Sequence, residues 1–266
     1  TFNLGLCLSP AVLGSKGAKL PLIGKLDIGP TAEGFVILVQ EALGPERRHE
    51  AIHVKMQLAP GFEVNIFDLQ PGCDHPLPLE EAFLRNFLAL ATLPPEATAP
   101  FEGIPQLIGL AIDEAYRLCT DRSGAKRYRR GVEPAVDRAI AGHRIELHGE
   151  EPWWRDVVAE LCRMGEWRLA GVAQRHAVPI LQDLITAVRT EHVQDAFANL
   201  KVAVTNERAT ELFTRYVKDL IKRFPTLNHP TKLDFGPARI IVIDLAAVAP
   251  TGSAQSNRQT EMMYML

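Results

Sequence analysis

Strand and helix patterns occupy separate parts of this chain. Residues 239–245 (RIIVIDL) are the clearest buried strand, and residues 20–27 form a similar apolar run near the start. Residues 79–223 instead carry apolar side chains at the 3.6-residue spacing of amphipathic helices. Strands that alternate with helices are typical of a parallel or mixed sheet with helices on its faces. The sequence therefore predicts an α/β domain with a large all-helical insertion.

The predicted elements follow this division. They are strands at 20–27, 52–58 and 62–67 with a helix at 32–43, then helices at 79–93, 153–164, 178–188 and 209–224, and finally the strand at 239–245 and a helix that runs to the last residue. We place the α/β core at 1–78 and 231–266 and the helical insertion at 79–230. Both ends of the chain are expected to be cut or disordered, because it opens without a methionine and closes on an uncapped helical pattern.

Composition narrows the class of protein. The net charge of −3 gives no support for a broadly basic nucleic-acid surface. The local basic cluster of Lys126, Arg127, Arg129 and Arg130 is interpreted as a solvated loop. No apolar run reaches the roughly 18 residues that span a bilayer. The four cysteines form no Cys-x-x-Cys pair, which is typical of reduced thiols in a cytosolic protein.

The segment at 107–114 (LIGLAIDE) has two interpretations. An apolar strand that ends in Asp113 and Glu114 would match the metal-binding strand of a P-loop ATPase, in which the aspartate holds Mg²⁺ and the glutamate polarises the attacking water. The apolar residues between 104 and 119 fall at helical spacing, however, and Pro105 suits a first helical turn. We favour the helix, which would place Asp113 and Glu114 on its polar side.

No phosphate-binding loop of the pattern G-x-x-x-x-G-K-[ST] occurs in the sequence. The loop at 250–256 (PTGSAQS) lies between a predicted strand and a predicted helix, where an anion could bind, but it has one glycine and no lysine. Arg258 could stand in as the cation, and a flexible loop is the simpler interpretation. Residues 73–75 (CDH) are a close group of metal ligands, but nothing nearby in the sequence completes a zinc site.

Several segments, taken in order, resemble the IcmB/DotO family of type IV secretion ATPases, which is related to the conjugative TraU proteins and to the large VirB-type ATPases. These segments are NLGLCLSP at 3–10, LDIGPT at 26–31, VNIFDLQPG at 64–72, PWW at 152–154, AQRHAVP at 173–179, residues 238–249, RQT at 258–260 and MYML at 263–266. The resemblance covers nearly the whole chain and rests on the ordered set. The family more often has an acidic residue where this chain has Ala246 and Ala247.

The resemblance implies an α/β fold with a RecA-like P-loop NTPase core, three layers in the order α-β-α, that carries the helical insertion. It also implies that the phosphate loop lies just before the first residue of this chain and that the metal-binding strand lies beyond the last. The chain is then expected to be an internal fragment of a motor ATPase. Such a fragment is expected to bind nucleotide weakly and to hydrolyse none by itself.

The cofactors of the intact motor are implied to be ATP and Mg²⁺. Asp27, Gly29 and Glu33 are the expected residues at the nucleotide edge of the sheet. Arg258 is the expected trans-acting arginine that stabilises phosphoryl charge in a neighbouring subunit. Asp113 as a metal ligand and Glu114 as a catalytic residue are expected only if residues 107–114 form a strand.

The resemblance further implies a hexamer that works with other secretion-machine ATPases and inner-membrane components, at the cytoplasmic face of the bacterial inner membrane. No sequence-specific binding of nucleic acid is expected. The alternative function is a non-catalytic assembly module. In that case the helical insertion docks partner proteins of the secretion machine, and the core supports it.

Overall fold

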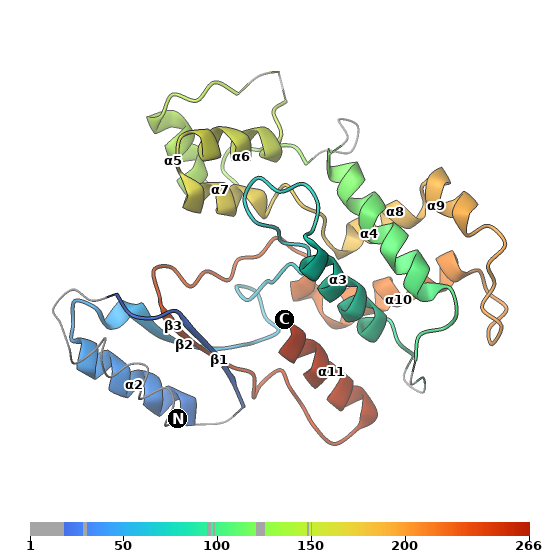
Figure 1. Cartoon of the computed structure of the whole chain (residues 1–266), viewed down its shortest axis with the longest axis horizontal. Helices are drawn as coiled ribbons and strands as arrows, with labels where there is room; N and C mark the ends of the chain where they lie inside the picture. Colours follow the sequence, from blue (N-terminus) through green and yellow to red (C-terminus); the bar gives the residue numbers. More distant parts are fainter. Residues whose placement is uncertain are drawn as a thin grey trace. The chain divides into compact units, whose positions relative to one another are not determined.

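The computed structural model describes residues 19–28, 31–94, 97, 99–120, 126–147, 149 and 151–266 (Figure 1). The chain divides into two compact units. The sheet unit comprises Thr1–Phe62 with Leu233–Leu266, and the helical unit comprises Glu63–Lys232. The predicted insertion at 79–230 lies within the helical unit, which begins at Glu63.

Three parallel strands form the sheet of the sheet unit, in the order β1-β3-β2 (Figure 1). They are β1 (Ile23–Asp27), β2 (Ala51–Lys55) and β3 (Ile240–Asp244), so the predictions of strands at 20–27, 52–58 and 239–245 are confirmed over these cores. The central position of β3 agrees with its nearly continuous apolar sequence, which is typical of parallel strands. The unit also contains α2 (Thr31–Leu43), the short 3₁₀ helix η1 (Arg48–Glu50) and α11 (Ala254–Met265).

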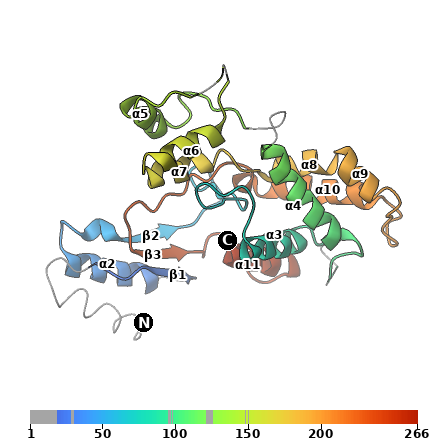
Figure 2. The same ribbon diagram turned by 45° about the horizontal axis from the view of Figure 1, so that its top comes forward.

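One face of the sheet packs against α2 (Figure 2). Side chains alternate between the faces of a strand, and Ile240 and Val242 of β3 lie on the α2 face, where both are fully buried. They share this core with Val36 and Val39 of α2. Burial of each such side chain stabilises the fold by about 1.5–3 kcal/mol. Ile243, on the opposite face, remains partly exposed. The sheet unit is therefore a small parallel sheet with a helix on one face.

The prediction of a strand at 62–67 is wrong. The backbone turns at Asn65, whose side-chain Oδ1 accepts a hydrogen bond from N of Phe67 at 3.1 Å. The carbonyl of Asn65 accepts a second bond from N of Asp68 at 3.3 Å. Asparagine favours such turns because its side chain bonds to the backbone two residues further on. Ile66 and Phe67 are buried nonetheless, which explains why this short apolar run imitates a strand.

Helices make up most of the helical unit. They are α3 (Pro78–Ala91), α4 (Ile104–Thr120), α5 (Pro134–Gly142), α6 (Trp154–Arg163), α7 (Trp167–Gln174), α8 (Leu181–Val188), α9 (Glu191–Ala196) and α10 (Ala209–Arg223), with the 3₁₀ helix η2 (Pro225–Leu227). The four predicted helices at 79–93, 153–164, 178–188 and 209–224 are confirmed as α3, α6, α8 and α10. Helices α5, α7 and α9, with 9, 8 and 6 residues, were not predicted as separate elements.

Helix α4 decides between the two interpretations of residues 107–114. Ile104–Thr120 is one continuous helix, so the favoured helical prediction is confirmed. Leu107, Ile108, Ala111 and Ile112 are fully buried on one side of it. The helix packs against α3 and α8 of the same unit. Its apolar run is thus the buried stripe of an amphipathic helix, and residues 107–114 form no metal-binding strand.

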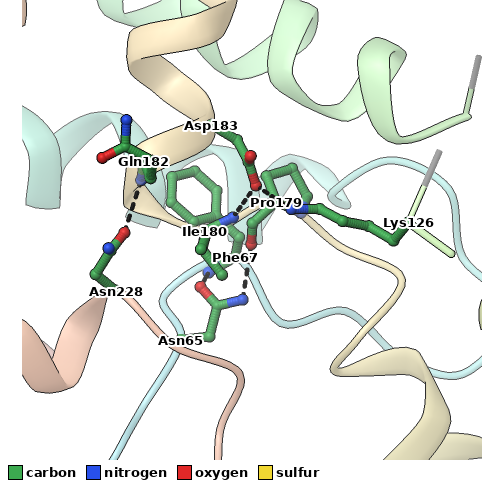
Figure 3. Close-up of polar contacts among 8 residues, drawn as sticks. All are labelled: Asn65, Phe67, Lys126, Pro179, Ile180, Gln182, Asp183 and Asn228. Carbon is green, nitrogen blue, oxygen red and sulfur yellow. Dashed lines mark hydrogen bonds and ion pairs between the residues drawn. The ribbon is translucent and has the colours of Figure 1, made fainter. Parts of the chain in front are cut away.

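Polar contacts join segments of the helical unit that are far apart in the sequence (Figure 3). Nδ2 of Asn65 donates to the carbonyl of Pro179 at 2.7 Å, and Oδ2 of Asp183 accepts from N of Ile180 at 2.8 Å at the start of α8. The same Oδ2 of Asp183 binds Nζ of Lys126 at 2.5 Å. The interpretation of the basic cluster as a solvated loop is therefore wrong at Lys126, which is held against α8.

Two of the segments that carry the family resemblance lie next to each other in this unit. The Gln174 side chain accepts from N of Gly72 at 3.2 Å and donates to the carbonyl of Cys73 at 3.0 Å. Gln174 is 5% exposed, so both ends of its amide need such partners. The contact between Asn65 and Pro179 is a second link. Hydrogen bonds thus hold segments 64–72 and 173–179 together, although the two segments are far apart in the sequence.

Candidate functional site

The carboxyl ends of the three strands carry charged side chains in register. β1 ends at Asp27, β2 at Lys55 and β3 at Asp244, and Asp244 is the Cα partner of both neighbours. Residues in register on parallel strands share a face, so all three belong to the α2 face of the sheet. In open α/β sheets, ligands bind just outside the carboxyl ends of the strands. We call Asp27, Glu33, Lys55 and Asp244 the sheet-edge cluster.

Glu33 joins the cluster from the first turn of α2. Nζ of Lys55 donates to Oε2 of Glu33 at 2.9 Å, and about half of each side chain is exposed. The hydrogen bond from Lys55 and its positive charge lower the pKa of Glu33 below its ordinary value. The same hydrogen bond and charge of Glu33, with a smaller contribution from Asp244, raise the pKa of Lys55. Lys55 therefore remains a cation beside the carboxylates of Glu33 and Asp244.

The two aspartates are fixed by hydrogen bonds to the adjoining backbone. Oδ1 of Asp27 accepts from N of Ile28 at 3.1 Å, and its Oδ2 accepts from Nζ of Lys25 at 3.1 Å. Oδ1 of Asp244 accepts from N of Ala246 at 2.8 Å. The chain leaving β3 is held as well, because N of Leu245 donates to the carbonyl of Asp27 at 2.8 Å. The edge thus presents two oriented carboxylates with remaining acceptor capacity.

His53 lies two residues before Lys55 on the same strand and the same face. Its Nε2 is buried without a hydrogen-bond partner among the described residues. Its nearness to the cluster is reflected in the pKa of Glu33, which it lowers slightly. An unpaired buried ring nitrogen beside a charged edge adds a potential donor or acceptor to the site. His53, Lys55 and Asp244 were not predicted as site residues.

The structure places the predicted residues of the nucleotide edge, and the predicted trans-acting arginine, in different surroundings. Asp27 and Glu33 are both in the sheet-edge cluster, where Asp27 pairs with Asp244 of β3 and Glu33 binds Lys55 of β2. Gly29 lies outside the described residues. Arg258 is on α11, in the second turn after the N-cap residue Ser253, and is partly buried. Its trans-acting role stays a prediction.

Asp113 and Glu114 lie in the helical unit, and the strand on which their predicted metal and catalytic roles depended is absent there. The expectation that both lie on the polar side of the helix is wrong for Glu114. Asp113 is exposed, but Glu114 is 2% exposed and accepts two hydrogen bonds from Arg117, at 2.7 and 2.8 Å. These bonds lower the pKa of Glu114. A buried carboxylate is tolerated because a cation one turn away neutralises it, so Glu114 has a structural partner.

The other sequence candidates have structural explanations. In the loop at 250–256, Oγ of Ser253 accepts from N of Ser256 at 3.0 Å and thereby caps α11. Cys73 is a free thiol, and Asp74 forms an ion pair with Arg155. In the described ranges, no group of three or more His, Cys, Asp or Glu side chains is arranged to hold a metal ion. Nor does any helix in that part of the chain have the length and apolar character needed to cross a membrane.

Comparisons of this chain with protein-family models, with curated proteins and with solved structures found no match.

Proposed function

We propose that this chain is part of a motor ATPase of type IV secretion or conjugation, and that its sheet unit belongs to a RecA-like P-loop NTPase core. The observation that supports this most is the sheet-edge cluster. Two aspartates, a glutamate and a lysine from three strands and one helix meet where α/β sheets bind ligands. The specific reaction, ATP hydrolysis, is inferred from the resemblance of the ordered sequence segments to the IcmB/DotO family.

The chemistry of the cluster suits the phosphate side of a nucleotide site. Mg²⁺ in such sites is held by one or two carboxylates, by substrate phosphates and by water, so Asp27 and Asp244 are sufficient without a third protein ligand. When bound, Mg²⁺ would neutralise phosphate charge. Lys55 supplies a fixed positive charge and now pairs with Glu33. If a phosphate oxygen replaced Glu33 as the partner, Lys55 would still be fully paired. Glu33 and His53 would then be free to orient water.

The proposal needs a phosphate-binding loop from polypeptide outside these 266 residues, because the sequence contains none. We propose that the intact motor is a hexamer at the cytoplasmic face of the bacterial inner membrane, with other secretion-machine ATPases and inner-membrane components as partners. Arg258 would act on the nucleotide of a neighbouring subunit. A RecA-like core with three layers would also need helices on the sheet face that carries Ile243, which α2 does not cover.

Hydrolysis assays on two forms of the protein test this proposal. ATP turnover is expected from a longer polypeptide that adds a Gly-Lys-Ser or Gly-Lys-Thr loop shortly before Thr1, and only background turnover is expected from the 266-residue chain. Turnover by the 266-residue chain that is lost on Glu114→Gln would contradict the proposal. The absence of any Gly-Lys-Ser or Gly-Lys-Thr sequence upstream in the encoded protein would contradict it independently.

The second candidate is a non-catalytic assembly module. It is favoured by the extensive core and polar contacts that the helical unit has within itself. Two results together would support this candidate over the motor. The 266-residue chain would capture secretion-machine components equally well with and without Asp27→Asn and Asp244→Asn, and the longer polypeptide would show no ATP turnover.

A further inference from the structure

A groove in the helical unit is lined by positively charged side chains. It has a volume of about 370 Å³ and lies among the end of α8, α9 and α10. Arg189 comes from the end of α8, and Glu211, Thr214, Arg215 and Lys218 come from α10. The α10 residues are three or four positions apart, so they share one face of that helix. All of the lining belongs to a single unit of the chain.

Two of these cations have no ion-pair partner among the residues that the structure describes. Arg215 forms an ion pair with Glu207 at 2.9 Å, which raises the pKa of Arg215. Arg189 and Lys218 are exposed, and neither has an ion pair within the described ranges of the chain. The groove therefore has more positive than negative side chains in its lining, with Glu211 as its one carboxylate.

The groove also offers hydrogen-bond acceptors. Glu211 contributes an exposed carboxylate, and Oγ1 of Thr214 donates to the carbonyl of Thr210 at 2.7 Å, which leaves the hydroxyl oxygen able to accept. A ligand that suits this lining must carry anionic groups for Arg189 and Lys218. It must also carry N–H donors for Glu211 and Thr214.

We propose that this groove binds an extended segment of a partner protein in which acidic side chains alternate with small residues. Its carboxylates would pair with Arg189 and Lys218, and its backbone N–H groups between them would donate to Glu211 and Thr214. A nucleic-acid strand fits less well, because it presents a phosphate at every nucleotide and has no backbone N–H groups between them to donate to Glu211 and Thr214. The site lies in the helical unit and does not depend on the nucleotide chemistry proposed for the sheet unit.

The experiment uses the 266-residue chain and a short fluorescein-labelled peptide in which glutamate alternates with glycine. Fluorescence anisotropy at low salt would measure its binding to the unchanged chain, to the double variant Arg189→Gln/Lys218→Gln and to the matched control Arg129→Gln/Arg138→Gln. The control removes the same charge from two other exposed positions. We expect the groove variant to weaken binding by about fivefold or more and the control by less than about twofold, given the usual strength of exposed charge pairs.

Four results would overturn the proposal. The first is no binding of the peptide to the unchanged chain, and the second is equal weakening by the groove variant and the control. The third is tighter binding of a labelled oligothymidylate than of the peptide, with the same loss in the groove variant, because that would identify the groove as a nucleic-acid site. A peptide with glutamine in place of glutamate should not bind, and equal binding of this peptide would also overturn the charge-based account. The far-ultraviolet circular dichroism of both variants should match the unchanged chain, since all four substituted side chains are exposed.

Discussion

Asp27 and Asp244 are Cα partners at the carboxyl ends of the neighbouring parallel strands β1 and β3. The backbone holds this arrangement, because N of Leu245 donates to the carbonyl of Asp27 and N of Met56 donates to that of Asp244. Two like charges in register at one edge repel each other, so their pairing is unfavourable unless cations are near. Lys25 and Lys55 provide those cations, and a bound metal ion would provide a stronger one.

Replacement of Lys55 should raise the pKa of Glu33. In Lys55→Gln the hydrogen bond and the positive charge that lower this pKa are both removed. In the unchanged chain the ion pair stabilises the fold above the ordinary glutamate pKa, and this contribution is lost as the pH falls through the lowered value. A carboxyl ¹³C NMR titration would measure the shift. Arg48→Gln, which breaks the exposed pair with Glu41, is the control and should leave the Glu33 titration unchanged. An unchanged Glu33 pKa in Lys55→Gln would contradict the observed contact.

Loss of Arg117 should destabilise the helical unit. Arg117→Ala leaves the buried carboxylate of Glu114 without its two hydrogen bonds, at an expected cost of about 1–3 kcal/mol. The pKa of Glu114 is lowered in the folded chain, so the stabilisation is present above the ordinary glutamate pKa and is lost as the pH falls through the lowered value. Urea unfolding at neutral and acidic pH would measure this. Arg163→Ala breaks a more exposed pair with Glu160 at the same spacing and should cost about 0–1 kcal/mol. Equal losses in the two variants would argue against a structural role for Glu114.

Asn65 should be among the polar residues most important for the stability of the helical unit. Asn65→Ala removes the donor to Pro179 and the acceptor for Phe67, both in buried surroundings, and should cost about 2–3 kcal/mol. Asn228→Ala removes one exposed bond from N of Gln182 and should cost about 1 kcal/mol or less. Thermal and urea unfolding would compare the two. A smaller loss for Asn65→Ala than for Asn228→Ala would contradict the contacts in Figure 3.

The two faces of the sheet should differ in their sensitivity to substitution. Ile240 is fully buried under α2, so Ile240→Ala should cost about 2–5 kcal/mol. Ile243 is partly exposed on the other face, so Ile243→Ala should cost less than half as much in the 266-residue chain. The free energy of unfolding from urea titration tests this. Equal losses would show that the face with Ile243 is also fully buried.

Local patterns predicted the elements of the sheet unit well, because its strands are short apolar runs. The strand pattern placed Asp27 at the ligand-binding edge of the sheet, whereas Glu33 was expected there only from the family resemblance. Local patterns could not predict Lys55 and Asp244 as neighbours. Their pairing depends on the register between β2 and β3, and the whole helical unit lies between these two strands in the sequence.

Two errors in the helical region have the same physical origin. Local pattern assigns polar residues to the surface, but Glu114 is buried because Arg117, one turn later, neutralises it. The pattern also assigns a strand to 62–67, although the Asn65 side chain turns the chain there. In both cases a specific side-chain partner overrides the average preference of the segment. The arginine three residues after the glutamate and the asparagine before Ile66 are the signals that could have revealed them.

The proposed nucleotide role of the sheet edge is tested most directly by ATP hydrolysis in the longer polypeptide that contains this chain and a phosphate-binding loop. Steady-state turnover of Asp244→Asn should fall by at least about tenfold, which corresponds to about 1.4 kcal/mol of lost transition-state stabilisation. Asp219→Asn, an exposed substitution of the same kind on α10, should leave turnover unchanged. Equal turnover in Asp244→Asn and Asp219→Asn, at the level of the unchanged protein, would contradict the account.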